Sequence, residues 1–327
     1  MSGIGFLGTG SARPQQELFT TDKEIELGLV PGQLSLPTGV KSRRVATLGE
    51  SSISLGTEAA LQAVAAAGLK ADDLDLILSA SAIPYQAIPS TAPLYQRALG
   101  ISGVPCFDIN ATCLSFVSAT DMARAMVATG RAKHVLVVSS EIASLGLPWH
   151  SAPETAALFG DGAAAAVVGH VATGGIRAVK METYSEAYEA CQVPIGGTRL
   201  NIHADPEGYQ KAAWFHMDGH VLYKLTAKKL RRFVGAVLEE AGWAMDEVDL
   251  VIPHQASRGG IDHAIRMLGI APERVVDILG NHGNQIAASI PTALHYATQE
   301  GRLKPGTKAL MVGTSAGVSL GALAWEA

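Results

Sequence analysis

Residues 104–129 read VPCFDINATCLSFVSATDMARAMVAT. The apolar run at 104–109 predicts a buried strand. Over residues 114–129, apolar side chains recur at helical spacing, and Gly130 follows them as a typical helix stop. The stretch therefore predicts a buried strand and a buried helix, joined by a short turn that carries Cys113.

The same alternation surrounds this stretch. Residues 74–80 and 134–138 predict further strands, and residues 91–99 predict a helix. Apolar strands that alternate with helices are typical of an α/β fold with a mostly parallel, buried sheet.

The second half of the chain repeats this order. Residues 275–279 predict a strand, a Gly-rich turn follows, residues 285–299 predict a helix, and residues 308–312 predict another strand. Each half also closes with a Gly turn and a strand of small apolar residues, at 159–168 and 313–322. We infer a structural duplication.

The two halves are expected to join near residues 170–175, where a Gly-Ala-rich run ends and a new strand is predicted. This gives an N-terminal half at 1–172, with the candidate nucleophile, and a C-terminal half at 173–327. Residues 192–215, rich in Pro, Gly and His, predict a long loop over the site.

Composition narrows the class of protein. The 327 residues are 48% hydrophobic and 17% charged, with a net charge of -5, which indicates a globular chain and disfavours nucleic acid as a partner. No apolar run reaches the roughly 18 residues of a membrane span, and the start shows no signal-peptide pattern, so we expect a cytoplasmic protein without a membrane contact. Basic clusters at 41–44 and 228–232 fit either an acidic carrier or a solvated surface.

Three cysteines are too few and too scattered for a disulfide framework or a metal site, and no metal is expected. Cys113 lies between a buried strand and a buried helix, where unsatisfied N–H groups favour a thiolate nucleophile. A small buried thiol is the structural alternative. Cys106, within a strand, and Cys191, in a predicted loop, fit that alternative better.

Two further residues follow predicted strands or turns. His254 ends a predicted strand that begins at Leu250, where the carboxyl edge of a sheet commonly forms a ligand site, and its neutral ring can donate or accept a proton near pH 7. Asn284 precedes the helix that corresponds by duplication to the one after Cys113. A pseudo-twofold axis would bring both helix starts to one cavity. A helix cap remains the alternative for Asn284, and His282 fits a turn residue.

With these residues in place, the chain resembles the β-ketoacyl-acyl carrier protein synthase III family of thiolase-fold condensing enzymes. The resemblance covers nearly the full length. It is carried by segments at 38–40, 108–113, 159–163, 253–256, 282–284, 287–289 and 301–306.

The resemblance implies a thiolase-like fold, with two pseudo-duplicated halves in a layered α-β-α-β-α sandwich. It implies a decarboxylative Claisen condensation, an acyltransferase reaction in fatty-acid or related biosynthesis, between a primer on Cys113 and a malonyl thioester. His254 and Asn284 would hold the extender carbonyl, and the backbone N–H groups of Cys113 and Ala316 would form the oxyanion hole. Two neutral donors could each contribute about 2.7–4 kcal/mol to enolate stabilisation.

The resemblance also implies the partners. We expect a homodimer that needs no cofactor and takes coenzyme A or acyl-carrier thioesters as substrates. Gln255, Ser257 and Arg258, which follow the catalytic histidine, are expected to contact the carrier protein or coenzyme A.

Several positions depart from the fatty-acid starter enzymes of this family, and one departure is the usual triple-Gly turn near the C-terminus, which reads Ser315-Ala316-Gly317 here. Gln33 and Pro153 replace a Trp and an Arg used for coenzyme A, which puts coenzyme A recognition in question. Ile88 stands at a gate that is often Phe in acetyl-selective members, so we expect a primer longer than acetyl.

Other functions are compatible with parts of the pattern. A synthase III-like acyltransferase would pass the acyl group from Cys113 to an alcohol or amine, with His254 as general base. A non-catalytic thiolase-fold subunit would be expected to lack one of the three residues. A papain-like hydrolase is disfavoured because Cys113 lacks the Cys-Gly-Ser-Cys-Trp context.

Overall fold

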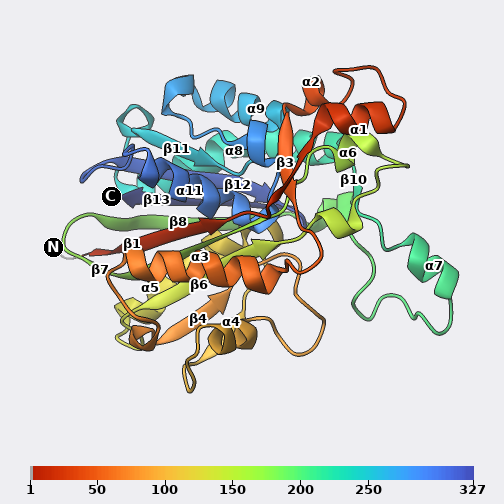
Figure 1. Ribbon diagram of the computed structural model, residues 1–327. Helices are drawn as coiled ribbons and strands as arrows, with labels where there is room; N and C mark the ends of the chain where they lie inside the picture. Colours follow the sequence, from red (N-terminus) through yellow and green to blue (C-terminus); the bar gives the residue numbers. More distant parts are fainter. Residues whose placement is uncertain (1–2) are drawn as a thin grey trace.

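The computed structural model describes residues 3–327 and contains two main sheets (Figure 1). The five-stranded sheet has the order β1 (Gly3–Ala12), β7 (Gly162–Val171), β6 (Val135–Glu141), β4 (Leu76–Ser79), β5 (Cys106–Asp108). The four-stranded sheet has the order β11 (Leu250–Pro253), β12 (Lys308–Ser315), β13 (Ser319–Glu326), β8 (Gly175–Thr183).

Two helices lie between the sheets, α5 (Ser115–Ala128) and α11 (Ser289–Gln299). Their apolar faces share one core with the inner faces of both sheets, because Phe116 and Leu294 pack in the same cluster as Val137 and Met311. This shared core explains why both helices are strongly apolar in sequence.

The outer face of each sheet carries its own helices. α3 (Ser52–Ala66) and α4 (Ala92–Ala98) cover the five-stranded sheet, and α8 (Gly219–Ala241) and α9 (Arg258–Leu268) cover the four-stranded sheet (Figure 1). The layers alternate helix, sheet, helix, sheet, helix, so the predicted layered α-β-α-β-α sandwich is confirmed.

The prediction of mostly parallel sheets is wrong. β4 is parallel to both β5 and β6, and β11 is parallel to β12, but the remaining pairs are antiparallel. β12 and β13 are joined by only three residues, too short a link for the crossover that parallel strands need.

Most predicted elements are present, with two differences. Residues 275–279 form no regular strand: Val275 makes one isolated bridge with Val251, and α10 (Leu279–His282) begins immediately afterwards. The predicted loop over 192–215 contains α7 (Pro206–Lys211), which Asp205 caps by accepting from Gly208 N–H, and this segment reaches away from the body (Figure 1).

The turns before α5 and α11 repeat each other in detail. Asn110 Oδ1 accepts from Thr112 N at 2.9 Å, and Asn284 Oδ1 accepts from Ile286 N at 2.8 Å. Thr112 and Ile286 have left-handed backbones, with φ of 51° and 50°, which β-branched residues rarely adopt.

The repeat continues into the helices. Ser115 Oγ accepts from the backbone of Ala111, and Ser289 Oγ accepts from that of Gln285, both at 3.0 Å. These bonds support the inferred duplication, while the boundary between residues 172 and 173 stays a prediction.

Candidate active site

Cys113 lies in the short helix η2 (Thr112–Leu114), directly before α5. Its own backbone N–H and that of Ala316, in the turn between β12 and β13, both act as hydrogen-bond donors to the thiol sulfur. These are the two N–H groups expected to form an oxyanion hole, and that role stays a prediction.

The surroundings of Cys113 oppose the expected thiolate. Burial raises the pKa of the Cys113 thiol, and the nearby Cys191 and Glu141 raise it further, against the lowering effect of the two N–H groups. The side chain is only partly buried, and the thiolate stays a prediction.

His254 and Asn284 lie in direct contact. His254 directly follows β11, and its Nε2 lies 3.2 Å from Asn284 Oδ1. That oxygen also accepts from Ile286 N, which fixes the orientation of the amide, so the imidazole donates from Nε2. Burial lowers the pKa of His254 to about 4, and the ring is neutral at pH 7.

The same geometry leaves an amide donor available. Asn284 Nδ2 has only a long contact of 3.5 Å with the carbonyl of Ala256. The Nδ2–H of Asn284 is therefore the less committed donor, whereas the Nε2–H of His254 would have to leave Asn284 Oδ1 to bind a ligand oxygen.

Close packing brings the nucleophile's turn to these two side chains. A Cβ at Gly313 of β12 would lie 2.8 Å from His254 Cβ and 3.3 Å from Leu114 Cδ2, so only glycine lets these groups approach. η2 also packs against η7 (Ile286–Ala288), which follows Asn284. The structure thus gathers all three residues predicted to be catalytic, and their roles stay predictions.

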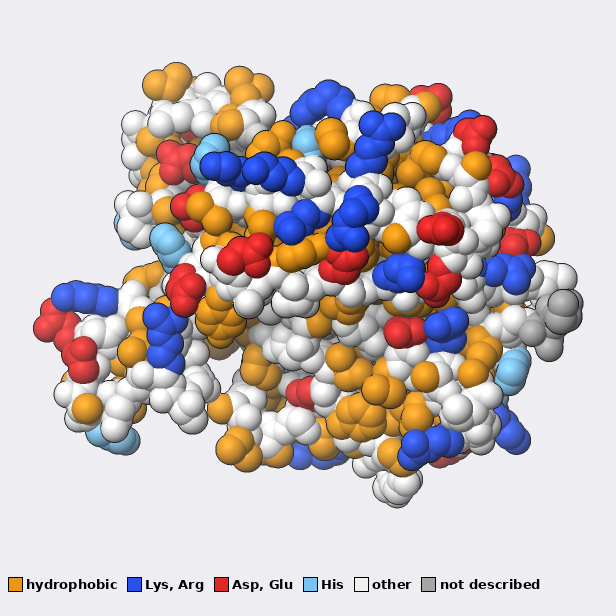
Figure 2. Space-filling view, turned by 180° about the vertical axis from the view of Figure 1, so that it is seen from behind, with side chains coloured by type: hydrophobic (Ala, Val, Ile, Leu, Met, Phe, Trp, Pro, Cys, Tyr) orange, Lys and Arg blue, Asp and Glu red, His pale blue; other side chains and the backbone are white. Residues whose placement is uncertain are grey.

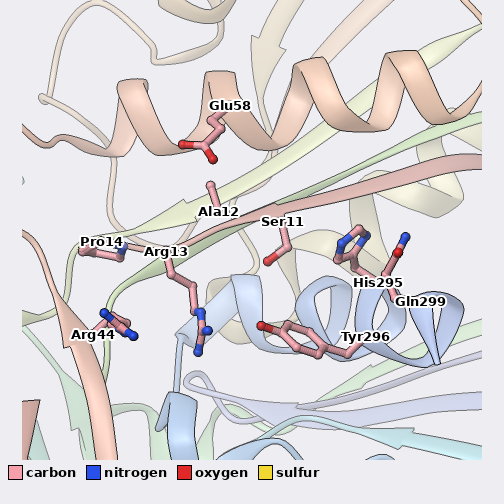
Figure 3. A pocket seen from close by; sticks show the side chains of 9 residues that line it. All are labelled: Ser11, Ala12, Arg13, Pro14, Arg44, Glu58, His295, Tyr296 and Gln299. Carbon is pink, nitrogen blue, oxygen red and sulfur yellow. The ribbon is translucent and has the colours of Figure 1, made fainter. Parts of the chain in front are cut away.

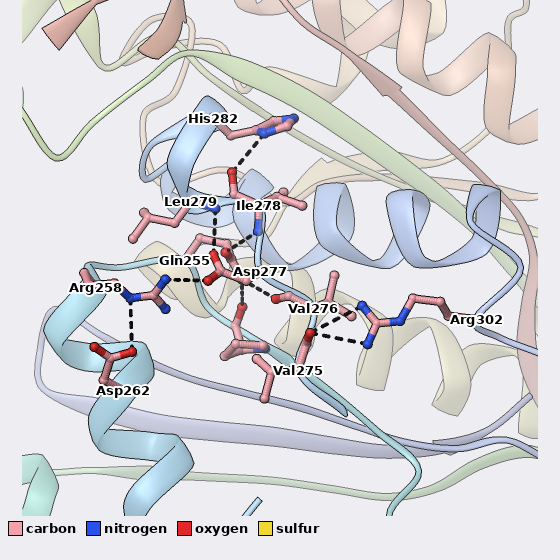
Figure 4. Close-up of polar contacts among 11 residues, drawn as sticks. Gln255, Arg258, Asp262, Val275, Val276, Asp277, Ile278, Leu279, His282 and Arg302 are labelled. Atoms are coloured by element: carbon pink, nitrogen blue, oxygen red, sulfur yellow. Dashed lines mark hydrogen bonds and ion pairs between the residues drawn. The ribbon is translucent and has the colours of Figure 1, made fainter. Parts of the chain in front are cut away.

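The residues after His254 differ from expectation (Figure 4). Gln255 has no exposed surface: its Nε2 donates to the carbonyls of Pro253 and Val276, and its Oε1 accepts from Ile278 N. The prediction that Gln255 contacts a carrier or coenzyme A is therefore wrong, because the side chain satisfies backbone groups in place of strand pairing.

Ser257 and Arg258 are closer to the surface but are also engaged. Ser257 Oγ caps α9 by accepting from Gly260 N. Arg258 pairs with Asp277 at 2.5 Å and with Asp262 at 3.1 Å (Figure 4), so two carboxylates already balance its charge.

Ile88 lies on the segment between β4 and α4 and is 87% exposed. Ile83, Tyr85 and, on the edge strand β5, Phe107 are exposed as well. Such an exposed side chain would need a partner subunit to enclose it, so its expected role at a gate stays a prediction.

Two residues near Cys113 were missed by the sequence analysis. Cys191 lies in β9 (Cys191–Gln192), which pairs with β10 (His216–Met217), and it is close enough to raise the pKa of Cys113. Glu141 is a fully buried carboxyl at the end of β6. An acidic residue at the carboxyl end of an apolar strand was the available signal for Glu141, whereas nothing in the sequence around Cys191 indicated its position.

A pocket of about 420 Å³ lies apart from these residues (Figure 3). It opens between the end of β1, α3 and α11. Its lining includes Arg13, whose Nη1 is 3.2 Å from His282 Nε2. His282 is buried, and its other ring nitrogen, Nδ1, lies 3.0 Å from the carbonyl oxygen of Ile278, which fits the predicted turn residue. In residues 3–327, no helix is both long and apolar enough to cross a membrane.

Comparisons with known proteins agree with this geometry. The family model described as 3-oxoacyl-[acyl-carrier-protein] synthase III matches residues 107–187, and the model of that family's C-terminal domain matches residues 238–327. A β-ketoacyl-[acyl-carrier-protein] synthase III from Symbiobacterium thermophilum is 36% identical over 98% of this chain and 97% of its own length. One from Neisseria meningitidis is 34% identical, with 97% of each chain covered.

Solved structures show the same likeness. The 3-oxoacyl-[acyl-carrier-protein] synthase III of Aquifex aeolicus has a TM-score of 0.90 and 34% identity, covering 99% of this chain and 100% of its own. The priming β-ketosynthase of the R1128 polyketide pathway has a TM-score of 0.91 and 26% identity, covering 99% and 96%.

Proposed function

The chain belongs to the 3-oxoacyl-[acyl-carrier-protein] synthase III family of condensing enzymes, and from this membership we propose the roles of Cys113, His254 and Asn284 in its condensation. The family's reaction belongs to fatty acid biosynthesis. The observation that carries the assignment is the neutral His254 in contact with Asn284 beside the thiol of Cys113.

The first step is acylation of Cys113. Its sulfur attacks the carbonyl carbon of the primer thioester, and the N–H groups of Cys113 and Ala316 hold the resulting oxyanion. The bond to the leaving thiol then breaks, and the proton lost by Cys113 ends on that thiol. Because the pKa of Cys113 is raised, its deprotonation is coupled to the arrival of the substrate.

The second step is decarboxylation of the malonyl thioester. His254 Nε2–H and Asn284 Nδ2–H donate to the thioester oxygen while the bond to the carboxylate breaks and carbon dioxide leaves. Each donor is expected to contribute about 2.7–4 kcal/mol to the enolate-like transition state. The enolate carbon then attacks the acyl carbonyl, and Cys113 leaves and regains a proton.

A pair of variants tests the second step. His254→Ala or Asn284→Ala should stop carbon dioxide release from malonyl thioester and still give an acyl-Cys113 adduct by mass spectrometry. If both variants kept releasing carbon dioxide, transfer of the acyl group to an alcohol or amine would become the better assignment.

The substrate carrier is expected to dock on the basic face of α8. Figure 2, which views the molecule from behind, shows Lys and Arg side chains gathered on the upper part of that face, where α8 lies. Exposed Lys228 and Arg231 belong to this helix, whereas Arg232 pairs with Glu182 at 2.5 Å. We expect such a face to attract an acidic carrier protein. Arg258 is a weaker candidate because its charge is balanced.

A homodimer is proposed through the edge of the five-stranded sheet. β5 is the edge strand, and exposed Phe107 lies on it next to the apolar segment that contains Ile83, Tyr85 and Ile88. An edge strand with an apolar surround is a surface that a second copy can cover.

A further inference from the structure

Glu141 ends β6 and has no exposed surface. In place of a Lys or Arg partner it has backbone donors. Its Oε1 accepts from Ala82 N at 2.6 Å, its Oε2 accepts from Ile83 N at 3.1 Å, and the N–H of Ala287 also points to it. A carboxyl placed this deeply is costly unless its hydrogen bonds are made, so these three donors explain how it is tolerated.

The donors come from two separate loops. Ala82 and Ile83 begin the segment that leads from β4 towards Ile88. Ala287 lies in η7, three residues after Asn284, and η7 packs against β6. Glu141 is therefore a direct link between a loop of the first half and the Asn284 turn of the second half.

A neighbouring contact provides a comparison. Ser139 Oγ, two residues earlier on β6, donates to the carbonyl of Ala80 at 2.6 Å and is buried. This bond fastens the same loop to the same strand without reaching η7. The link to the Asn284 turn thus distinguishes Glu141 from Ser139.

We propose that Glu141 is a positioning residue, which holds the Asn284 turn and the segment after β4 in fixed relation around Cys113. This inference rests on the proposed role of Asn284 in decarboxylation. Glu141 touches no substrate in this proposal and acts only through the backbone groups it binds.

The charge of Glu141 also affects the ionisation of Cys113, and this effect can be measured separately from the reaction. Burial raises the pKa of Glu141 to about 8 against the lowering effect of its N–H donors, and the nearby Asp161 also raises it. Tyr95 faces Glu141 as well, and burial keeps its hydroxyl protonated. Towards Cys113 the titrating neighbours are Glu141 and Cys191. In the alkaline range where Cys113 ionises, Glu141 is a carboxylate and opposes that ionisation.

Glu141→Gln distinguishes the positioning role and the effect on Cys113 ionisation from a loss of folding stability. The amide replaces one acceptor oxygen by a donor that faces a backbone N–H, so the loops shift. A displacement of about 1 Å can cost about 100-fold in rate, and we expect a loss of that order in carbon dioxide release. Formation of acyl-Cys113 should fall much less. The midpoint of Cys113 alkylation by iodoacetamide should move to lower pH, because a neighbouring negative charge is gone.

Two variants complete the experiment. Glu141→Asp keeps the charge but withdraws the carboxyl by one methylene, so it should lose carbon dioxide release and leave the alkylation midpoint near that of the parent. Ser139→Ala should lower thermal stability without altering the ratio of decarboxylation to acylation. All rates refer to protein whose folded fraction is checked by circular dichroism.

Equal losses of acylation and decarboxylation in both Glu141 variants, or a ratio matching that of Ser139→Ala, would overturn the proposal. If Asn284→Ala itself kept full carbon dioxide release, the assigned role of Asn284 would fail, and the inference about Glu141 would fail with it. If Asn284→Ala lost the reaction while Glu141→Gln and Glu141→Asp kept it, only the positioning role would be refuted.

Discussion

Asn110 and Asn284 occupy equivalent places in the two halves, since the Oδ1 of each accepts the N–H of the residue two positions later, at 2.9 and 2.8 Å. The amide oxygen of Asn284 therefore has a structural task that it shares with Asn110. Its amide nitrogen does not share that task, and in Asn110 the same nitrogen is committed to the carbonyl of Ala82 at 3.0 Å. The proposed catalytic donor, Asn284 Nδ2–H, is thus an addition to a turn that occurs in both halves of the fold.

Asn284→Asp is expected to separate the two tasks. The carboxylate keeps the oxygen that accepts from Ile286, so the turn should persist, but the Nδ2–H donor is lost. Removing one such donor costs about 100- to 1000-fold in rate, and carbon dioxide release from malonyl thioester should fall by that order. The pKa of His254 should rise above about 4, because a negative charge now lies beside it. Retained decarboxylation in a folded Asn284→Asp protein would argue against the donor role.

Acid stability should report the burial of His254. The pKa of His254 is lowered to about 4 in the folded protein against about 6.5 unfolded, so the unfolded chain binds more protons between these values. The free energy of unfolding therefore does not suffer from this residue above pH 6.5, and it decreases as the pH drops towards 4. The shift corresponds to about 3 kcal/mol at the acid end.

The measurement is urea unfolding at pH 7.5, 5.5 and 4.5. His254→Gln should lose less free energy of unfolding over this range than the parent. His282 has a similarly lowered pKa, to about 4, and His282→Gln therefore serves as a comparison with the same sign. Parallel curves for the parent and His254→Gln would contradict the prediction.

Covalent catalysis at Cys113 is tested by replacing each of the three cysteines in turn. Cys113→Ala should abolish acyl-enzyme formation in intact-protein mass spectrometry, whereas Cys106→Ala should leave it unchanged. Cys191→Ala should also be acylated, and its Cys113 should be alkylated at lower pH, because Cys191 contributes to the raised pKa. Acyl label persisting on Cys113→Ala would falsify the assignment of the nucleophile.

Sequence reasoning located the site but not its electrostatics. The predicted strand and helix around Cys113, and the repeat of that pattern before Asn284, were sufficient to bring both turns together, because local periodicity and duplication are visible in a single chain. The pKa of Cys113 could not be predicted in this way. It depends on burial and on Glu141 and Cys191, which are distant in sequence.

The two wrong predictions, a strand at residues 275–279 and a carrier contact at Gln255, also depend on contacts between residues distant in sequence. Residues 275–279 are apolar enough for a strand, but the buried amide of Gln255 takes the hydrogen bonds that a strand partner would make. The prediction that Gln255 contacts a carrier failed because a side chain next to His254 could point either outwards or into the backbone. Only tertiary packing decides between these directions.

Dimerisation is tested at the edge strand. Phe107→Glu places a charge on the exposed apolar face beside β5 and should shift the protein to monomers in multi-angle light scattering at micromolar concentration. Leu48→Glu alters a more exposed apolar residue outside that surface and should have no effect. A parent protein that is monomeric and fully active would refute the dimer.

The primer is expected to be longer than acetyl, and Ile88 is the residue on which this depends. Ile88 is 87% exposed in one chain, so we expect it to line the pocket of a partner subunit, and its effect should vanish in the monomeric Phe107→Glu variant. In a dimer, Ile in place of an aromatic ring leaves a smaller and more adaptable wall. Each buried methylene contributes about 0.8 kcal/mol, and two or three of them offset weaker binding of the nucleotide end at Gln33 and Pro153.

The ratio kcat/KM should therefore rise from acetyl through butyryl to hexanoyl or octanoyl thioesters until the pocket is full. Ile88→Phe should shift the optimum back towards short primers while leaving acylation of Cys113 by acetyl thioester intact. A maximum at acetyl in the parent, or an unchanged chain-length profile in Ile88→Phe, would show that another side chain closes the pocket.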